Sequence, residues 1–291
     1  MKLALVLHPH KPSALRVLER IVDLARAGRH EVLVCVPASD PWWRRTGAPA
    51  GVRPIEDLRE ADAVVALGGD GTLLHAVRHL QGIERPLLGI NLGNLGFLTD
   101  TPEGQAEDAV RCLLEGRYRI DSRMLLEARH AGRNGETQVR VGLNDAVMHG
   151  PGARVLDISL RVGGVDLGRT LADGFIVATP SGSTAYSLSA GGPVISPRIQ
   201  ALVVTPVSPH TLAMRPLVVA ADEEIDIELH RSAGGSAALS VDGQTVVELA
   251  AGDRVTVRRA PRDLHLVVTT DSNFFDTLRT KLGWGHRVRG S

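Results

Sequence analysis

The chain has 291 residues, of which 43% are hydrophobic and 23% are charged, so it is long enough for two domains and too apolar for a disordered protein. Its 33 basic residues balance 33 acidic residues, so net charge gives no reason to expect a nucleic acid or an anionic membrane as partner. The apolar start Leu3–Leu7 is too short for a signal-peptide core, and no apolar run is long enough to span a membrane. Cys35 and Cys112 have no CxxC partner, so we expect buried thiols, no structural zinc and a cytoplasmic location.

Up to about residue 118, short apolar runs alternate with segments of helical period, which predicts a parallel sheet with helices between its strands. The expected strands cover residues 2–8, 31–37, 61–67 and 86–93. The expected helices cover Pro12–Ala27, a segment starting at Thr72 and a segment starting near Pro102. Residues 38–55, rich in Gly, Pro and Arg and containing the Trp42–Arg45 loop, are expected to form a surface loop without an assigned role.

From residue 119 the apolar period changes to two, which indicates half-buried strands. The alternation is clearest over Leu156–Val162 and returns over residues 225–229, 255–257 and 264–268. The pattern after Asn273 is helical again and ends at Gly283, so a C-terminal helix should pack back on another element. We therefore expect an α/β domain over 1–118 and 266–291, and a β-rich domain over 119–265.

The strongest local motif is Gly68-Gly69-Asp70-Gly71-Thr72, between an apolar strand and a helical pattern. Glycines permit positive φ and close approach of a ligand, and a helix start directs free N–H groups at an anion, so this turn suits phosphate. A carboxylate beside polyphosphate would be repelled unless Asp70 binds metal or accepts a proton. The alternative is a structural turn in which Asp70 only caps the helix. His75, one helical turn further on, is a weaker candidate for the same anion or a solvated side chain.

A second polar segment, residues 173–193, follows a strand with a run of hydroxyl side chains and glycines. This composition suits a hydrogen-bonding cradle for a polar ligand, with Tyr186 offering a further contact, although an ordinary Ser/Gly loop has the same composition. Upstream, Asn144 and Asp145 interrupt an apolar run, where burial without partners would be costly. They form either part of a site or a turn at the end of a sheet.

Taken together, these motifs resemble the NAD kinases. The family's motifs occur here in the family's order: GGDGT at 68–72, LND at 143–145, the segment 173–193, PHTL with Arg215 and Pro216 at 209–216, VDGQ at 241–244 and the ending FFDTLRTKLGWG. The glycine turn alone is shared with lipid kinases and phosphofructokinases, whereas the long hydroxyl-rich segment separates them from NAD kinases.

The resemblance implies that Asp70 is the general base toward the 2′-hydroxyl of the adenosine ribose of NAD. It implies that NAD is contacted by Asp70, Gly71, Asn144, Asp145, Arg154, Asp173, Thr184, Ala185, Tyr186, Ser187, Leu188, Ser189 and Gln244. Phosphate would lie against Gly68, Gly69, Gly71 and Thr72. Phe97 would flank the adenine, or belong to the core, and Leu171 stands where many members have Arg or Gly, which leaves the phosphoryl donor open.

The implied reaction transfers the terminal phosphoryl group of ATP to NAD, with Mg²⁺ carried by ATP and no dedicated metal site in the protein. Inorganic polyphosphate is an open alternative donor, and NADH an open alternative acceptor. The resemblance also implies a homodimer or a homotetramer. A lipid or sugar kinase, and a dinucleotide sensor without turnover, are the rival functions, and formation of NADP from each acceptor and donor separates them.

Overall fold

The computed structural model describes residues 1–7, 11–36, 49–133, 135–150, 152, 155–233, 235–271 and 273–283. Contacts within the chain divide it into two units, of which the first comprises Met1–Ser122 with Leu264–Ser291 and the second Arg123–Asp263. The sequence placed these boundaries at 118 and 266. The predicted fold class, an α/β part and a β-rich part with a C-terminal helix in the first, is confirmed.

The first unit is built on one eight-stranded sheet with the order β3-β2-β1-β4-β5-β20-β7, in which β6 also pairs with β5. Its strands are β1 (Lys2–Leu7), β2 (Glu31–Cys35), β3 (Val52–Ile55), β4 (Ala63–Gly68), β5 (Pro86–Asn91), β6 (Thr101–Pro102), β7 (Arg119–Arg123) and β20 (Leu264–Val268). Its α-helices are α1 (Pro12–Ala27), α3 (Asp70–Leu80), α4 (Ala106–Leu114) and α6 (Phe274–Leu282), with short 3-10 helices at Leu58–Glu60 and Glu103–Gln105.

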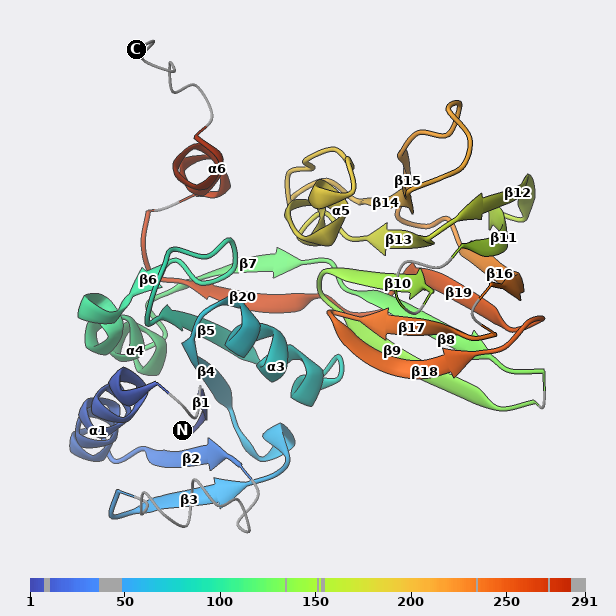
Figure 1. The fold of residues 1–291 in the computed structure, drawn as a ribbon. Helices are drawn as coiled ribbons and strands as arrows, with labels where there is room; N and C mark the ends of the chain where they lie inside the picture. Colours follow the sequence, from blue (N-terminus) through green and yellow to red (C-terminus); the bar gives the residue numbers. More distant parts are fainter. Residues whose placement is uncertain are drawn as a thin grey trace. The chain divides into compact units, whose positions relative to one another are not determined.

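The helices of this unit cover both faces of the sheet. The apolar faces of α1 and α4 share one buried cluster with β1, β2, β4 and β5, and α3 is outside that cluster and packs on β4 and β1 (Figure 1). In α1 the predicted bounds are confirmed, because Pro12 suits the first helical turn and Val17, Leu18, Ile21 and Ala25 recur on one buried face. The pairs β1-β2, β1-β4 and β4-β5 are parallel, as the alternating pattern predicts.

Four details of the first unit differ from the prediction. Val52–Ile55, placed in a loop, is strand β3 and pairs with β2 in parallel, while residues 38–48 lie outside the described residues. The helix expected near Pro102 begins at Ala106, because a 3-10 turn comes first. The alternating segment Leu264–Val268 is a strand of the first unit and pairs in parallel with β5. Cys35 is buried as expected, but Cys112 is only half-buried.

The second unit consists of two six-stranded sheets, with the orders β15-β14-β13-β10-β17-β18 and β12-β11-β16-β19-β8-β9. The strands are β8 (Leu126–Ala131), β9 (Thr137–Gly142), β10 (Asp145–His149), β11 (Leu156–Val162), β12 (Val165–Ala172), β13 (Gly174–Ala178), β14 (Ala201–Val207), β15 (Leu217–Ala220), β16 (Ile225–Ser232), β17 (Ala237–Val241), β18 (Gln244–Leu249) and β19 (Arg254–Arg259). A 3-10 turn, Gly182–Thr184, and the short helix α5 (Tyr186–Ser189) follow β13.

Side chains from both sheets share one core in the second unit. Leu156, Ile158 and Leu160 of β11 are buried, as their alternation predicts, and they belong to the same cluster as Phe175 of β13. The strand β13 is buried at all five positions and carries the 173–193 segment directly after it. The polar segment therefore begins from a fixed point in the core.

The C-terminal helix α6 is confirmed between Asn273 and Gly283. The Asn273 side chain caps it by accepting from the N–H groups of Phe275 and Asp276, and Gly283 ends it with φ of 62°. The Phe274 ring lies 6.3 Å from the Phe97 ring, centroid to centroid, and the Lys281 Nζ lies 4.7 Å from that ring. The helix thus packs back on the 96–99 loop of the first unit, as predicted.

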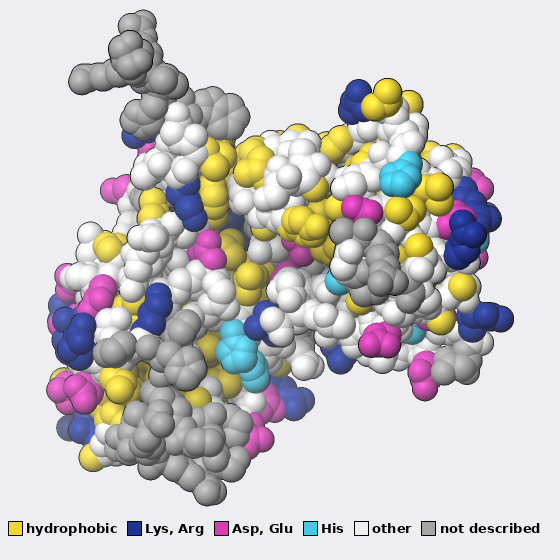
Figure 2. Space-filling view, viewed as in Figure 1, with side chains coloured by type: hydrophobic (Ala, Val, Ile, Leu, Met, Phe, Trp, Pro, Cys, Tyr) yellow, Lys and Arg dark blue, Asp and Glu magenta, His cyan; other side chains and the backbone are white. Residues whose placement is uncertain are grey.

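Charged side chains of both signs are interspersed on the visible face of each unit (Figure 2). Within the described residues, no helix combines the length and the apolar composition needed to cross a membrane.

Candidate active site

The glycine turn lies at the carboxyl end of β4. The helix after it begins at Asp70, two residues before the predicted start, because Gly69 takes an extended conformation and caps the helix. The Gly69 carbonyl accepts from the N–H groups of Thr72 and Leu73, at 2.9 and 3.1 Å. The first N–H groups of a helix have no partner within it, so the turn presents N–H groups and the positive end of the helix dipole.

None of the glycines of this turn takes a positive φ, which corrects the expectation, and only Gly68 is needed for space within the structure. Gly68, Gly69 and Gly71 are absent from the described glycines with positive φ. A Cβ atom at Gly68 would lie 2.0 Å from the Thr72 Oγ1 atom, so Thr72 packs where a side chain would be. At Gly69 and Gly71 a Cβ would meet nothing within 4 Å, so the backbone there is open to approach. That openness suits a phosphate group.

The Asp70 side chain does not cap its helix, because it accepts hydrogen bonds from four donors in the 97–99 loop: three backbone N–H groups and the Thr99 hydroxyl. Its Oδ1 atom accepts from Leu98 N, Thr99 N and Thr99 Oγ1 at 3.1, 3.1 and 3.0 Å, and its Oδ2 atom accepts from Phe97 N at 2.9 Å. Gly96 makes room for the carboxylate, since a Cβ there would lie 1.9 Å from Oδ1. With three donors on Oδ1 and one on Oδ2, Oδ2 is the oxygen with acceptor capacity left for another group.

The two weaker candidates near this turn differ in position. Phe97 is half-buried, its N–H bonds to Asp70 and its ring meets Phe274 and Lys281 of α6. His75 lies on the exposed face of α3, against His79. Partial burial, followed by the nearby His79 and Arg78, lowers the pKa of His75 to about 4. His75 is therefore neutral at pH 7 and offers an anion no charge.

In the second unit, Asn144 and Asp145 lie at the start of β10, where Asn144 is half-buried and Asp145 is only 5% exposed. Burial, with the charge of Asp242 as a second cause, raises the pKa of Asp145 to about 7. At neutral pH this carboxyl is protonated in part, so it can act as a hydrogen-bond donor as well as an acceptor.

The 173–193 segment packs directly against this turn. The Thr179 N–H group donates to the Asn144 carbonyl at 2.9 Å, and a Cβ at Gly182 would lie 1.9 Å from the same carbonyl oxygen. The structure thus brings Asn144 and Asp145 next to the hydroxyl-rich segment. This proximity is needed if both are to contact one ligand, as the family resemblance implies.

The residues from 184 to 189 differ in what they can offer a ligand. Thr184, Ala185 and Leu188 are half-buried, and Tyr186 and Ser189 are exposed. The Ser187 hydroxyl is fully buried and bonds to the Thr205 hydroxyl at 2.8 Å, so its side chain supports the turn and does not line a surface.

Three further candidates lie elsewhere on the second unit. Asp173 is half-buried, with its N–H group bonded to the Val207 carbonyl and its own carbonyl to Gly150 N–H. Gln244 is exposed at the start of β18, two residues after Asp242, and Leu171 is exposed on β12. Arg154 and the Trp42–Arg45 loop lie outside the described residues.

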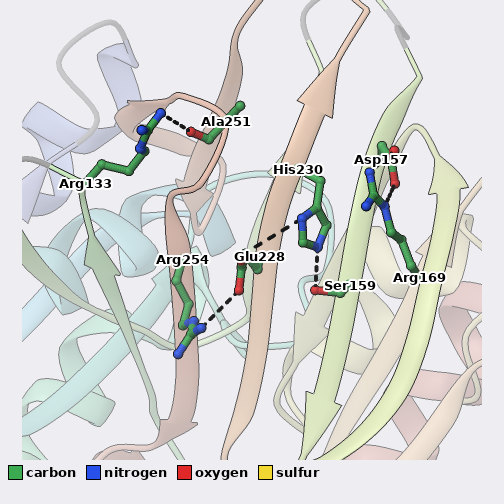
Figure 3. A network of polar contacts seen from close by, with 8 residues as sticks. All are labelled: Arg133, Asp157, Ser159, Arg169, Glu228, His230, Ala251 and Arg254. Atoms are coloured by element: carbon green, nitrogen blue, oxygen red, sulfur yellow. Dashed lines mark hydrogen bonds and ion pairs between the residues drawn. The ribbon is translucent and has the colours of Figure 1, made fainter.

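A separate polar cluster lies on β11, β12, β16 and β19 of the second unit (Figure 3). Arg254 bonds to Glu228 at 3.0 Å, His230 bonds to Ser159 at 2.9 Å, and Arg169 pairs with Asp157. Each of the arginines drawn on β12 and β19 is paired with an acidic side chain, Arg169 with Asp157 and Arg254 with Glu228. Within the described part of the chain, no group of three or more His, Cys, Asp or Glu side chains could hold a metal ion.

Comparisons with known proteins agree with this geometry. The family model described as the ATP-NAD kinase N-terminal domain matches residues 48–118, and the ATP-NAD kinase C-terminal domain matches residues 143–269. An NAD kinase of Gemmatimonas aurantiaca is 46% identical over 244 residues, covering 82% of each chain, and one of Geotalea daltonii is 39% identical over 290 residues, covering 98% of this chain and 99% of the relative. The chain belongs to the NAD kinase family. It is therefore an enzyme, a phosphotransferase.

Two solved structures share the fold of this NAD kinase family member. The structure of yeast NADH kinase complexed with NADH superposes with a TM-score of 0.91 at 26% identity, covering 100% of this chain and 89% of the other. An NAD kinase from Archaeoglobus fulgidus in complex with ATP superposes with a TM-score of 0.75 at 25% identity, covering 97% and 99% of the two chains.

Residue patterns missed four residues that hold the candidate site of this NAD kinase family member. Gly96 and Thr99 seat the Asp70 carboxylate, and Thr179 and Asp242 bind the backbone of residues 143–145. Thr179 and Asp242 lie within the motifs quoted at 173–193 and 241–244, and Gly96 and Thr99 lie next to Phe97 and Leu98, but their partners lie far away in the chain, so the sequence alone gave them no role.

Proposed function

We propose that the chain transfers the terminal phosphoryl group of ATP, as its Mg²⁺ complex, to the 2′-hydroxyl of the adenosine ribose of NAD, and that Asp70 is the general base. The observation that carries this proposal is the Asp70 carboxylate, which four donors hold beside the open N–H groups of a helix start. Phosphoryl transfer asks the protein mainly for positioning and for compensation of charge.

In this proposal the glycine turn binds phosphate through Gly68, Gly69, Gly71 and Thr72. The Asp70 Oδ2 atom accepts the proton of the ribose hydroxyl, since Oδ1 is already engaged by three donors. The bound Mg²⁺ enters with ATP as part of the substrate and compensates the charge of its phosphate oxygens. The proposed NAD contacts remain those given by the resemblance, with backbone contact alone from Ser187.

The test replaces the Asp70 carboxylate by an amide. General-base assistance is worth about 10²- to 10⁴-fold, so Asp70→Asn should lower kcat by that range while NAD still binds. The control is Asp108→Asn, which removes an exposed carboxylate of the same unit that pairs with Arg111 of its own helix. NADP formation is measured in a coupled assay, and NAD binding by calorimetry. Near-normal turnover of Asp70→Asn would remove Asp70 from this role.

The same assay addresses the donor and the redox form of the acceptor. ATP bound to the A. fulgidus relative and NADH bound to the yeast relative make both substrates reasonable here. Each of ATP and polyphosphate is combined with each of NAD⁺ and NADH, and we expect ATP with NAD⁺ to give the highest turnover. The cytoplasmic location and the homodimer or homotetramer stay predictions.

A further inference from the structure

Two residues bind every backbone polar group of the turn that carries Asn144 and Asp145. The Asp242 carboxylate accepts from Leu143 N at 2.9 Å on Oδ2, and from Asn144 N and Asp145 N at 2.7 and 3.2 Å on Oδ1. The Asp242 N–H group donates to the Asp145 carbonyl at 3.0 Å. Thr179 completes the set, because its hydroxyl donates to the Leu143 carbonyl and its N–H group to the Asn144 carbonyl.

This arrangement is buried and closely packed. Asp242 is 8% exposed and Thr179 is fully buried, so an N–H or carbonyl group left without a partner here would not find water to replace it. Glycine makes the close approach possible, since a Cβ at Gly142 would lie 2.6 Å from the Val241 Cγ1 atom and 3.1 Å from the Asp242 Oδ1 atom. Asp242 itself, with φ of 48°, and Gly243, with φ of 73°, form the two-residue hairpin turn between β17 and β18.

The three segments involved are far apart in the sequence. The turn at 143–145 precedes β10, Thr179 follows β13, and Asp242 joins β17 to β18, while β10 pairs with both β13 and β17. The direction of the Asn144 and Asp145 side chains is fixed by their backbone, and their backbone is fixed by these two residues.

We propose that Asp242 and Thr179 are positioning residues that hold Asn144 and Asp145 in the geometry that binds the nucleoside part of NAD, an inference that rests on the proposed role of that pair. Asp242 acts through its charge as well as through its bonds. The sheet neighbours here, Ala178 of β13 opposite Asp145 and Val241 of β17 opposite Ala146, are apolar, and Asp242 is the charged group that raises the pKa of Asp145 beyond the effect of burial. Removing the Asp242 charge therefore lowers the pKa of Asp145.

The principal test is Asp242→Asn, which keeps the size of the side chain and turns one acceptor oxygen into a donor facing an N–H group. Since a charge-assisted bond is lost, we expect KM for NAD to rise by on the order of 10-fold or more, with a smaller change in kcat. The pH at which KM for NAD changes should also move to a lower value. A merely structural role would not move this midpoint. Asp226→Asn is the control, because Asp226 is a half-buried carboxylate of the same unit that accepts from Thr256 Oγ1.

A second pair of variants decides the inference if Asp242→Asn does not fold, as judged by its thermal unfolding. Thr179→Val removes the hydroxyl donor and should raise KM for NAD, whereas Thr179→Ser keeps the donor and should restore a value near that of the unaltered chain. Equal KM values for these two, or an unchanged KM and pH midpoint in a folded Asp242→Asn, would overturn the inference. Absence of NADP formation by the unaltered chain would instead reject the proposed function.

Discussion

The space beside Gly96 gives a sharp prediction about the Asp70 carboxylate. In Gly96→Ala the added methyl group would lie 1.9 Å from Asp70 Oδ1 and 2.6 Å from Thr99 Oγ1, whereas real Cβ contacts are essentially never shorter than 3.0 Å. The carboxylate or the loop must therefore move by about 1 Å. Because a misplacement of about 1 Å in a reacting group costs on the order of 10²-fold, kcat for NADP formation should fall about 100-fold.

The matched control for this variant is Gly104→Ala, which adds the same methyl group to the same unit where it meets nothing within 4 Å. It should keep the turnover of the unaltered chain. Steady-state kcat and KM are measured by coupled NADP formation, with thermal unfolding to establish that each variant is folded. A folded Gly96→Ala enzyme with unaltered kcat would refute the reasoning that Gly96 is required to seat the base.

Three further predictions concern stability. The pKa of the Asp145 carboxyl is about 7 in the folded chain and near 4 in the unfolded chain. Between pH 4 and pH 7 the carboxyl is therefore protonated in the folded state and ionised in the unfolded state. As the pH rises through this range, this carboxyl lowers the free energy of unfolding by roughly 1 kcal/mol per pH unit. Asp145→Asn should remove that slope in urea unfolding; an identical slope would contradict it. Phe175→Ala, at a fully buried core position, should lower the free energy of unfolding by about 3–5 kcal/mol in the same assay, and a loss below about 1 would contradict the packing. Asn273→Ala removes the side-chain cap of α6 and should lower the free energy of unfolding by about 1 kcal/mol, measured by thermal unfolding. An unchanged stability would contradict the capping role of Asn273.

Local sequence patterns predicted the helices and strands whose bounds and buried faces are determined by residues within the element itself. The bounds of α1 follow from Pro12 and the buried stripe of Val17 and Ile21, and the end of α6 follows from Gly283. The alternation over β11 predicted its buried face for the same reason. These features repeat along the sequence, so a period can reveal them.

Pairing between distant segments could not be predicted in this way. Leu264–Val268 alternates like the strands of the second unit, yet it pairs in parallel with β5. This pairing depends on contacts with residues about 180 positions earlier, which the local alternation does not indicate. The glycine turn shows the same limit, since the room for the Asp70 carboxylate is provided by Gly96, 26 positions later in the chain. The Asp242 carboxylate binds backbone N–H groups about a hundred positions earlier, which no spacing rule indicates.

The position of β20 constrains the order in which the protein can form during synthesis. This strand lies between β5 and β7 in the first sheet, although residues 264–268 leave the ribosome after the whole of the second unit. Until then β7 lacks its β20 neighbour in that sheet, and β5 is paired on that side only by β6, at Ile90 and Asn91, whereas every described strand of the second unit has already been made. The nascent chain thus carries an incomplete first unit together with a fully synthesised second unit, and β20 joins β5 to β7 only after the second unit has been made.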